Sequence, residues 1–238
     1  MQTIEFHYRD ITIPISFSRK KMRNIRLSVG TGGKVRLSAP RGESERRIRE
    51  FLDKNAEWLY RKYVEKRERL SYCDGTFLSE SGETMLLGQR KRVLFSPEGK
   101  GATEESGCVV IRGVSDNPAK REKATEDFFR AVAQKVGAAL VDKWMPVFSA
   151  RGASRPTLSF RKMRSRWGSC NAAKCAVNLN LHLFKADLAC VEYVVVHELT
   201  HLLYKGHGAP FWAFVSALLP DWKERKRRLN AGLSSAES

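Results

Sequence analysis

Long hydrophobic runs are absent from this sequence. Its apolar stretches, such as residues 138–141 and 194–196, are far shorter than the roughly 20 residues that cross a bilayer. The first residues show no basic segment followed by an apolar run, so the sequence predicts neither a secretory signal nor a transmembrane helix. We therefore expect a soluble cytoplasmic protein with no membrane partner.

Cysteine is also scarce. The chain has five cysteines, an odd number, and they are widely spread, which is not the pattern of a disulfide framework. Cys170 and Cys175 are close in sequence and Cys190 follows, but no C-x-x-C pair supports a second metal site there. We expect reduced thiols that pack as small buried hydrophobic groups.

Acidic residues are too few to balance the basic ones. The chain has 43 Lys and Arg against 26 Asp and Glu, which gives a formal net charge of +17. Residues 1–70 carry +9, residues 71–150 are neutral and residues 151–238 carry +8, so the excess lies at the two ends. Such an excess indicates either an anionic partner, such as nucleic acid, or plain solubility.

Two basic segments are candidates for contact with phosphates, at residues 19–26 and 223–228. The alternative is that both are solvated surfaces. Aromatic residues are not interleaved with these charges, so we do not expect a platform on which single-stranded nucleic acid stacks. Nucleic acid is therefore a secondary candidate partner.

The hydrophobic pattern of the first half predicts strands interrupted by one helix. Residues 3–39 alternate apolar and polar in short bursts, which predicts a meander with a hairpin at Gly32 and Gly33. From Ser44, a plausible N-cap, apolar spacings of three and four predict an amphipathic helix over residues 44–68. Further strands are expected at residues 84–88, 93–96 and 109–112, with a loop over residues 97–107.

The second half has mainly helical spacing. Residues 118–150 predict one long helix. Two strands are expected after it, at residues 158–162 and 175–183, followed by helices at residues 187–205, 210–219 and 221–229. We therefore predict an α+β fold, with a β-rich N-terminal region over residues 1–117 and a second domain over residues 118–238.

One motif dominates the sequence: His197-Glu198-Leu199-Thr200-His201. On a helix, histidines four residues apart lie on one face, so both rings reach one metal ion and Glu198 lies beside the open coordination position. The valines at 194–196 favour a strand, but the apolar run is too long for one strand and Asp187 is a suitable N-cap. A buried helix is therefore expected.

A catalytic zinc ion takes three protein ligands and one water molecule. His207 is the best third ligand, because Gly206 can end the helix and turn the chain back toward the metal. Glu224 is the alternative third ligand, since a downstream helix supplies a glutamate in some zinc peptidases.

Three histidines and a glutamate define a reaction. Neutral histidine ligands leave zinc strongly Lewis acidic, and Glu198 can take a proton from the zinc-bound water and pass it to a leaving amine. This predicts hydrolysis of a peptide or protein substrate. Two alternatives stay open: a zinc hydrolase acting on nucleotide phosphoanhydrides, although no P-loop is visible, and a nucleic-acid-associated protease or binding module.

Several segments together resemble the YgjP-like metallopeptidases, relatives of the SprT-like and minimal gluzincin peptidases. They are residues 161–170 (RKMRSRWGSC), 178–180, 193–201, His207, Phe211-Trp212 and 219–222. The resemblance covers nearly the whole chain and implies a zincin-like C-terminal metallopeptidase domain with His197, His201 and His207 as Zn²⁺ ligands and Glu198 as general base. It supplies no settled physiological substrate.

The histidine spacing also fits the metzincin class. However, Tyr204 stands where that class needs glycine, and no Met-turn follows, so we reject it.

Arg166 and Tyr204 are candidate substrate-binding residues. Arg166 follows a predicted strand, and in related zinc peptidases such a strand pairs with extended substrate, so Arg166 is placed to bind a carboxylate or phosphate or to stabilise an oxyanion. A structural ion pair is the alternative. Tyr204 and Tyr193 are expected on the metal-facing side of the helix, either as oxyanion donors or as packing residues.

The strand over residues 175–183 carries a polar face. Asn178, Asn180 and His182 share it, and this face either lines the cleft or is solvated.

Overall fold

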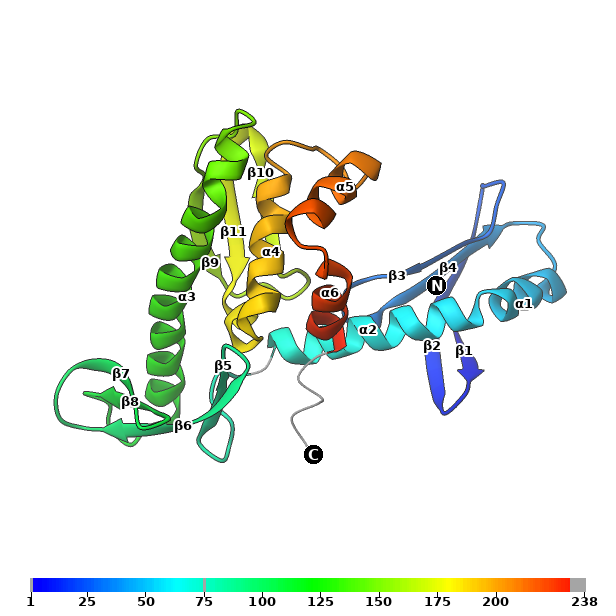
Figure 1. Ribbon diagram of the computed structural model, residues 1–238. Coiled ribbons are helices and arrows are strands. Elements are labelled where there is room, and N and C mark those ends of the chain that lie inside the picture. The colour runs from blue at the N-terminus through cyan, green and yellow to red at the C-terminus, as the bar shows by residue number, and fades with distance from the viewer. Residues whose placement is uncertain (1, 75, 232–238) are drawn as a thin grey trace. The chain divides into compact units, whose positions relative to one another are not determined.

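The computed structural model describes the backbone of residues 2–74 and 76–231. The contacts divide this chain into two compact units, one of residues 2–72 with residues 230 and 231 and one of residues 73–229, so the expected boundary after residue 117 falls inside the second unit. Both units combine helices with strands, which confirms the α+β class (Figure 1). In the described residues no helix combines the length and the apolar character that crossing a membrane requires.

The first unit is a four-stranded sheet covered by two helices. Its sheet order is β1-β2-β4-β3. The elements are β1 (Gln2–Tyr8), β2 (Ile11–Lys20), β3 (Arg26–Val29), the short 3-10 helix η1 (Thr31–Gly33), β4 (Val35–Pro40), α1 (Glu45–Lys54) and α2 (Ala56–Asp74).

The hairpin at Gly32 and Gly33 is confirmed, but the predicted meander is wrong. β3 and β4 pair antiparallel across that hairpin, whereas β2 pairs with β4 in parallel, which leaves β3 at the edge. Burial explains the order, because Val35 and Leu37 of β4 are buried while Leu27 of β3 is only partly buried. The strand with the more apolar inner face takes the central position.

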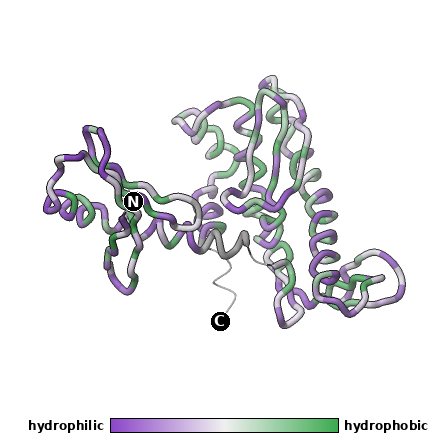
Figure 2. The backbone as a smooth tube through the Cα atoms, turned by 180° about the vertical axis from the view of Figure 1, so that it is seen from behind, coloured by the Kyte–Doolittle hydropathy of each residue, from purple (hydrophilic) through white to green (hydrophobic). Residues whose placement is uncertain are grey.

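The predicted helix over residues 44–68 is two helices. Ser44 caps α1 as expected, accepting a hydrogen bond from the Arg47 backbone N–H at 3.3 Å. The helix is interrupted at Asn55, whose Nδ2 donates to the Phe51 carbonyl at 2.7 Å. Apolar side chains of α1 and α2 cover the inner face of the sheet, and Figure 2 shows hydrophilic and hydrophobic stretches alternating along this unit.

The second unit contains a sheet of order β5-β6-β8-β7. Its strands are β5 (Glu83–Leu86), β6 (Gln89–Ser96), β7 (Gly101–Glu105) and β8 (Cys108–Arg112). β7 lies inside the predicted loop over residues 97–107, because its side chains are almost all exposed and show no apolar alternation. The turn after β5 is held by the Leu87 N–H, which donates to the Phe184 carbonyl at 2.9 Å. This bond joins the sheet to the site-bearing part of the same unit.

The rest of the second unit surrounds a sheet of order β10-β11-β9. Two long helices pack against each other and against this sheet, as Figure 1 shows. The elements are α3 (Pro118–Ser149), β9 (Thr157–Arg161), β10 (Gly168–Asn171), the 3-10 helix η2 (Ala172–Lys174), β11 (Ala176–Asn180), the 3-10 helix η3 (Leu181–Lys185), α4 (Leu188–Thr200), α5 (Ala209–Leu218) and α6 (Trp222–Ala231).

Two strand predictions in this part were incomplete. β10 (Gly168–Asn171) was not predicted, because its residues show no alternation of apolar and polar side chains. The strand expected over residues 175–183 ends at Asn180, because the chain turns into η3.

Candidate active site

The helix that carries the motif begins as expected and lies deep in the second unit. The Asp187 side chain accepts a hydrogen bond from the Cys190 backbone N–H at 3.0 Å and so caps α4. Val191, Val195 and Val196 are buried in the core. Valine favours strands, but here tertiary packing outweighs that intrinsic propensity and the segment is helical. The expected buried helix is therefore confirmed.

The helix ends five residues earlier than expected. α4 stops at Thr200, and His201 is its C-cap; the next backbone N–H groups bond to carbonyls three residues back, as in a tightened last turn. Gly206 therefore lies in the following loop and does not end the helix. His201 Nδ1 donates to the Tyr204 carbonyl at 3.2 Å, which leaves the Nε2 lone pair available to a metal ion.

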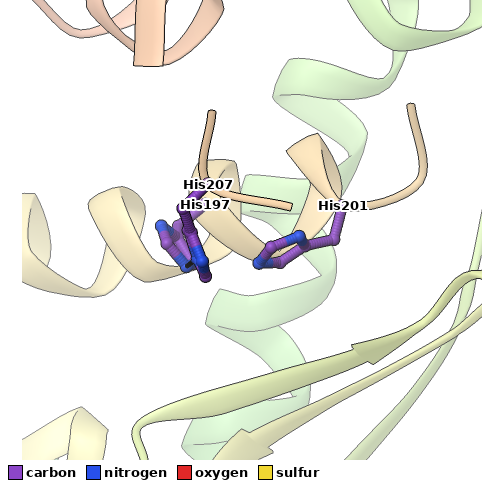
Figure 3. A group of neighbouring side chains, drawn as sticks. All are labelled: His197, His201 and His207. Carbon is purple, nitrogen blue, oxygen red and sulfur yellow. Dashed lines mark hydrogen bonds between the residues drawn. The ribbon is translucent and has the colours of Figure 1, made fainter. Parts of the chain in front are cut away.

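The loop after α4 brings the third histidine to the first. His207 Nε2 lies 3.1 Å from His197 Nε2, and Figure 3 shows these two rings overlapping with the His201 ring directed toward them. Phe211, at the start of α5 and buried, lies 4.8–5.0 Å from all three ring centres and forms a common wall beneath them.

The three histidines fit a metal ion. One nitrogen from each lies within 4.8 Å of the others, and no other such group of His, Cys, Asp or Glu is found among the described residues. Burial and the neighbouring His201 and His207 lower the pKa of His197 to about 3, so its ring is neutral and carries a lone pair. Tetrahedral zinc with Zn–N bonds of about 2.0–2.1 Å places its nitrogen ligands about 3.3 Å apart, close to the separation of His197 and His207.

Glu198 lies beside the histidines and is almost completely buried. Its exposed fraction is 6%. Burial raises the pKa of Glu198 to about 7, and the positive charge of Arg166 opposes that rise. The carboxylate packs against Gly168 of β10, where an added Cβ would lie 2.7 Å from Glu198 Oε1. Gly168 is thus part of the site. The sequence did not predict this role, because no local pattern indicates a contact between residues 30 positions apart.

A cavity of about 600 Å³ lies over these residues. The three histidines, Glu198, Arg166 and the residues of β10 line it. Within the described chain β10 is an edge strand, since only β11 pairs with it. Cys170 also faces this cavity, and burial raises the pKa of its thiol to about 11, so it stays protonated near neutral pH.

Asn180 positions the segment that carries Arg166. Its side chain is fully buried, and Nδ2 donates to the Met163 carbonyl at 2.6 Å and to the Arg166 carbonyl at 3.0 Å. The polar face predicted for Asn178, Asn180 and His182 is therefore neither solvated nor a cleft wall at Asn180. His182 belongs to η3, is buried and stacks on Phe77 with ring centres 4.4 Å apart.

The remaining candidate residues lie outside the cavity. The Tyr204 ring packs on Phe214 with centres 5.8 Å apart, and its contribution to the site is the carbonyl that holds His201. Tyr193 is buried against Trp222. Glu224, the alternative third ligand, is not in the metal-binding group; both of its oxygens accept from Arg227, at 2.6 and 2.7 Å.

The basic segment at residues 223–228 is largely engaged in structure. Arg225 pairs with Glu192 at 2.6 Å and Arg228 pairs with Asp187 at 2.6 Å, in addition to the pair that Arg227 makes. The pairs of Arg225 and Arg228 anchor α6 to α4 and its N-cap, and all three pairs favour a structural role for the segment.

A comparison with protein families gives one match, to the model described as YgjP-like, metallopeptidase domain, over residues 23–232. The chain belongs to the YgjP-like family. For this YgjP-like protein the match supports a metallopeptidase, and hence a hydrolase, as the general activity, and the histidine cluster indicates a metal ion. Comparisons with curated proteins and with solved structures give no match.

Proposed function

We propose that this YgjP-like protein is a zinc-dependent peptidase with a zincin-like active site, in which His197, His201 and His207 bind the ion and Glu198 is the general base. The observation that carries the proposal is that three histidine nitrogens within 4.8 Å of one another and a buried carboxylate line the same cavity. A purely structural zinc site uses cysteine ligands more often and has no need of an adjacent carboxylate.

In the proposed reaction the metal ion and Glu198 have separate roles. Zinc, when bound, supplies Lewis acidity toward a peptide carbonyl and toward water. Glu198 accepts a proton from the attacking water molecule as the new C–O bond forms. It then gives that proton to the amine nitrogen as the C–N bond breaks, so the carboxylate is regenerated and one water molecule is consumed per bond.

The edge strand supports a peptide as the substrate class. β10 lines the same cavity as Glu198, and an extended peptide can add to such an edge through backbone hydrogen bonds that depend little on sequence. In this arrangement Arg166 is the cation placed to bind a substrate carboxylate or to stabilise developing negative charge.

The substrate class is tested by comparing new protein N-termini in a proteome treated with the wild type and with Glu198→Gln. The proposal expects termini that depend on wild-type protein and are lost with the variant. Nucleoside di- and triphosphates are assayed in parallel. Hydrolysis of nucleotides by the wild type, with no new N-termini, would contradict peptide cleavage and support the phosphoanhydride alternative.

A further inference from the structure

A second cavity, of about 690 Å³, lies in the first unit and has no part in the proposed peptidase chemistry. It lies at the edge strand β3, where consecutive residues 25–28 line it together with residues of β2, β4, α1 and α2. We call it the β3 groove.

The β3 groove is basic and has no acidic lining residue in the described chain. Lys20, Arg26 and Arg36 line it, all exposed, and none of them has an ion pair or hydrogen bond among the described residues. Some other arginines of this unit are neutralised, as where Arg9 pairs with Glu57 at 2.7 Å. Three unneutralised cations around one hollow create a positive potential that attracts a polyanion.

Aromatic side chains share the groove with these cations. Phe51 of α1 and Trp58 of α2 line it, and Trp58 is 37% exposed with no ring partner in the described chain. An exposed indole in the same groove as guanidinium groups is a combination that can bind nucleic acid, because bases stack on the indole while the cations contact phosphates. The hydroxyls of Ser28 and Ser38 add neutral donors of the kind that contact phosphate oxygens.

We propose that the β3 groove binds single-stranded nucleic acid, with Trp58 stacking on a base and Lys20, Arg26 and Arg36 contacting phosphates. An acidic peptide would satisfy the cations but would leave the exposed indole and Phe51 without planar partners. The aromatic residues lie at least 15 positions from these cations in sequence, so only the folded unit brings them together.

The test is fluorescence anisotropy of the full chain with labelled oligothymidylate and oligouridylate of about 16 nucleotides. We expect Trp58→Leu to weaken binding about tenfold, while Trp58→Phe retains most of it. Arg26→Gln/Arg36→Gln should weaken binding and flatten the plot of log affinity against log salt by about 1.4. Equal binding of oligothymidylate and oligouridylate supports the proposal, because it indicates recognition through phosphates and bases alone.

The matched control is Arg41→Gln/Arg49→Gln, which removes the same charge from exposed arginines of this unit outside the groove. It should leave both affinity and salt slope close to wild type. No binding of either oligonucleotide would overturn the proposal, as would equal losses in the two double variants. If polyglutamate binds with the same affinity as the oligonucleotides, and this affinity does not change in Trp58→Leu, the proposal is overturned in favour of an acidic peptide.

Discussion

At the residue scale, the site depends on two backbone features as much as on its motif. The Tyr204 carbonyl holds the His201 ring so that Nε2 is available to a metal ion, and the missing side chain of Gly168 makes room for the Glu198 carboxylate. Neither feature is part of the His-Glu-x-x-His pattern. Tyr204 follows α4 directly in the chain, whereas Gly168 approaches α4 only in the folded protein.

His207→Ala should remove bound zinc from the purified protein, because it deletes one of three ligands. Zinc content is measured by mass spectrometry after dialysis. Glu224→Gln should retain about one zinc ion per chain, since this glutamate is bound to Arg227 away from the histidines. The reverse result, with zinc lost from Glu224→Gln and kept by His207→Ala, would identify Glu224 as the third ligand.

Gly168→Ala should lower the rate of peptide hydrolysis about tenfold or more while zinc content is unchanged. The added Cβ would lie 2.7 Å from Glu198 Oε1, so the carboxylate has to move. Gly42→Ala is the matched control, because its Cβ would meet no atom within 4 Å. Full activity in Gly168→Ala would show that the position of the carboxylate against β10 does not matter.

At the scale of elements, α4 is held in place by a cluster of polar side chains around its residue Glu192. The same helix carries His197 and Glu198 of the proposed site. Glu192 accepts hydrogen bonds from Lys143 and Trp144 of α3, at 2.6 and 3.1 Å, and from Arg225 of α6, at 2.6 Å. Burial opposes ionisation of Glu192, but these bonds outweigh it and lower its pKa. Three helices therefore meet at one carboxylate.

Glu192→Gln should lower the free energy of unfolding by about 1–3 kcal/mol at neutral pH. A lowered pKa in the folded state gives stability that is present above the unfolded pKa and lost as pH falls through the folded pKa. The difference between wild type and variant should therefore shrink as pH falls below about 4.5, which urea unfolding at several pH values measures. An equal difference at all pH values would contradict a charge effect.

Elements with a strong local pattern were predictable. Asp187 and Ser44 cap the helices expected of them, and the helix over residues 118–150 is observed as α3, within one residue. Local chemistry decides these cases, since a cap acts within three residues and an amphipathic period repeats along one element.

Elements defined by long-range pairing were not predictable. β10 reads as a loop because its residues do not alternate, and it exists through its pairing with β11. The parallel pairing of β2 with β4 likewise depends on which strand buries its inner face most completely. The early end of α4 follows from bonds to carbonyls three residues back, which residue types at 201–205 do not dictate.

At the scale of the whole molecule, the two units have different chemistry. The histidine cluster and its cavity lie in the second unit, and the basic β3 groove lies in the first. The +17 charge alone could not locate either, because ion pairs use up much of the basic segment at residues 223–228 while Lys20, Arg26 and Arg36 stay unpaired in the described chain.

Removal of zinc with a chelator should abolish peptide hydrolysis and lower the thermal unfolding midpoint by about 5–10 °C. In the proposed function the ion would join α4 to the loop that carries His207 and so stabilise the folded state. Oligonucleotide binding should be unaffected, because no metal-binding group is found in the described part of the first unit. Added zinc should restore activity; loss of oligonucleotide binding on chelation would show that the two units are coupled.

The central claim is that three histidines hold a zinc ion beside Glu198. X-ray absorption at the zinc edge of the purified protein tests it most directly, because Cys170 lines the same cavity and offers the competing ligand atom. The claim predicts nitrogen and oxygen neighbours at about 2.0–2.1 Å and no sulfur. A sulfur neighbour at about 2.3 Å, or a protein that binds no zinc, would contradict it.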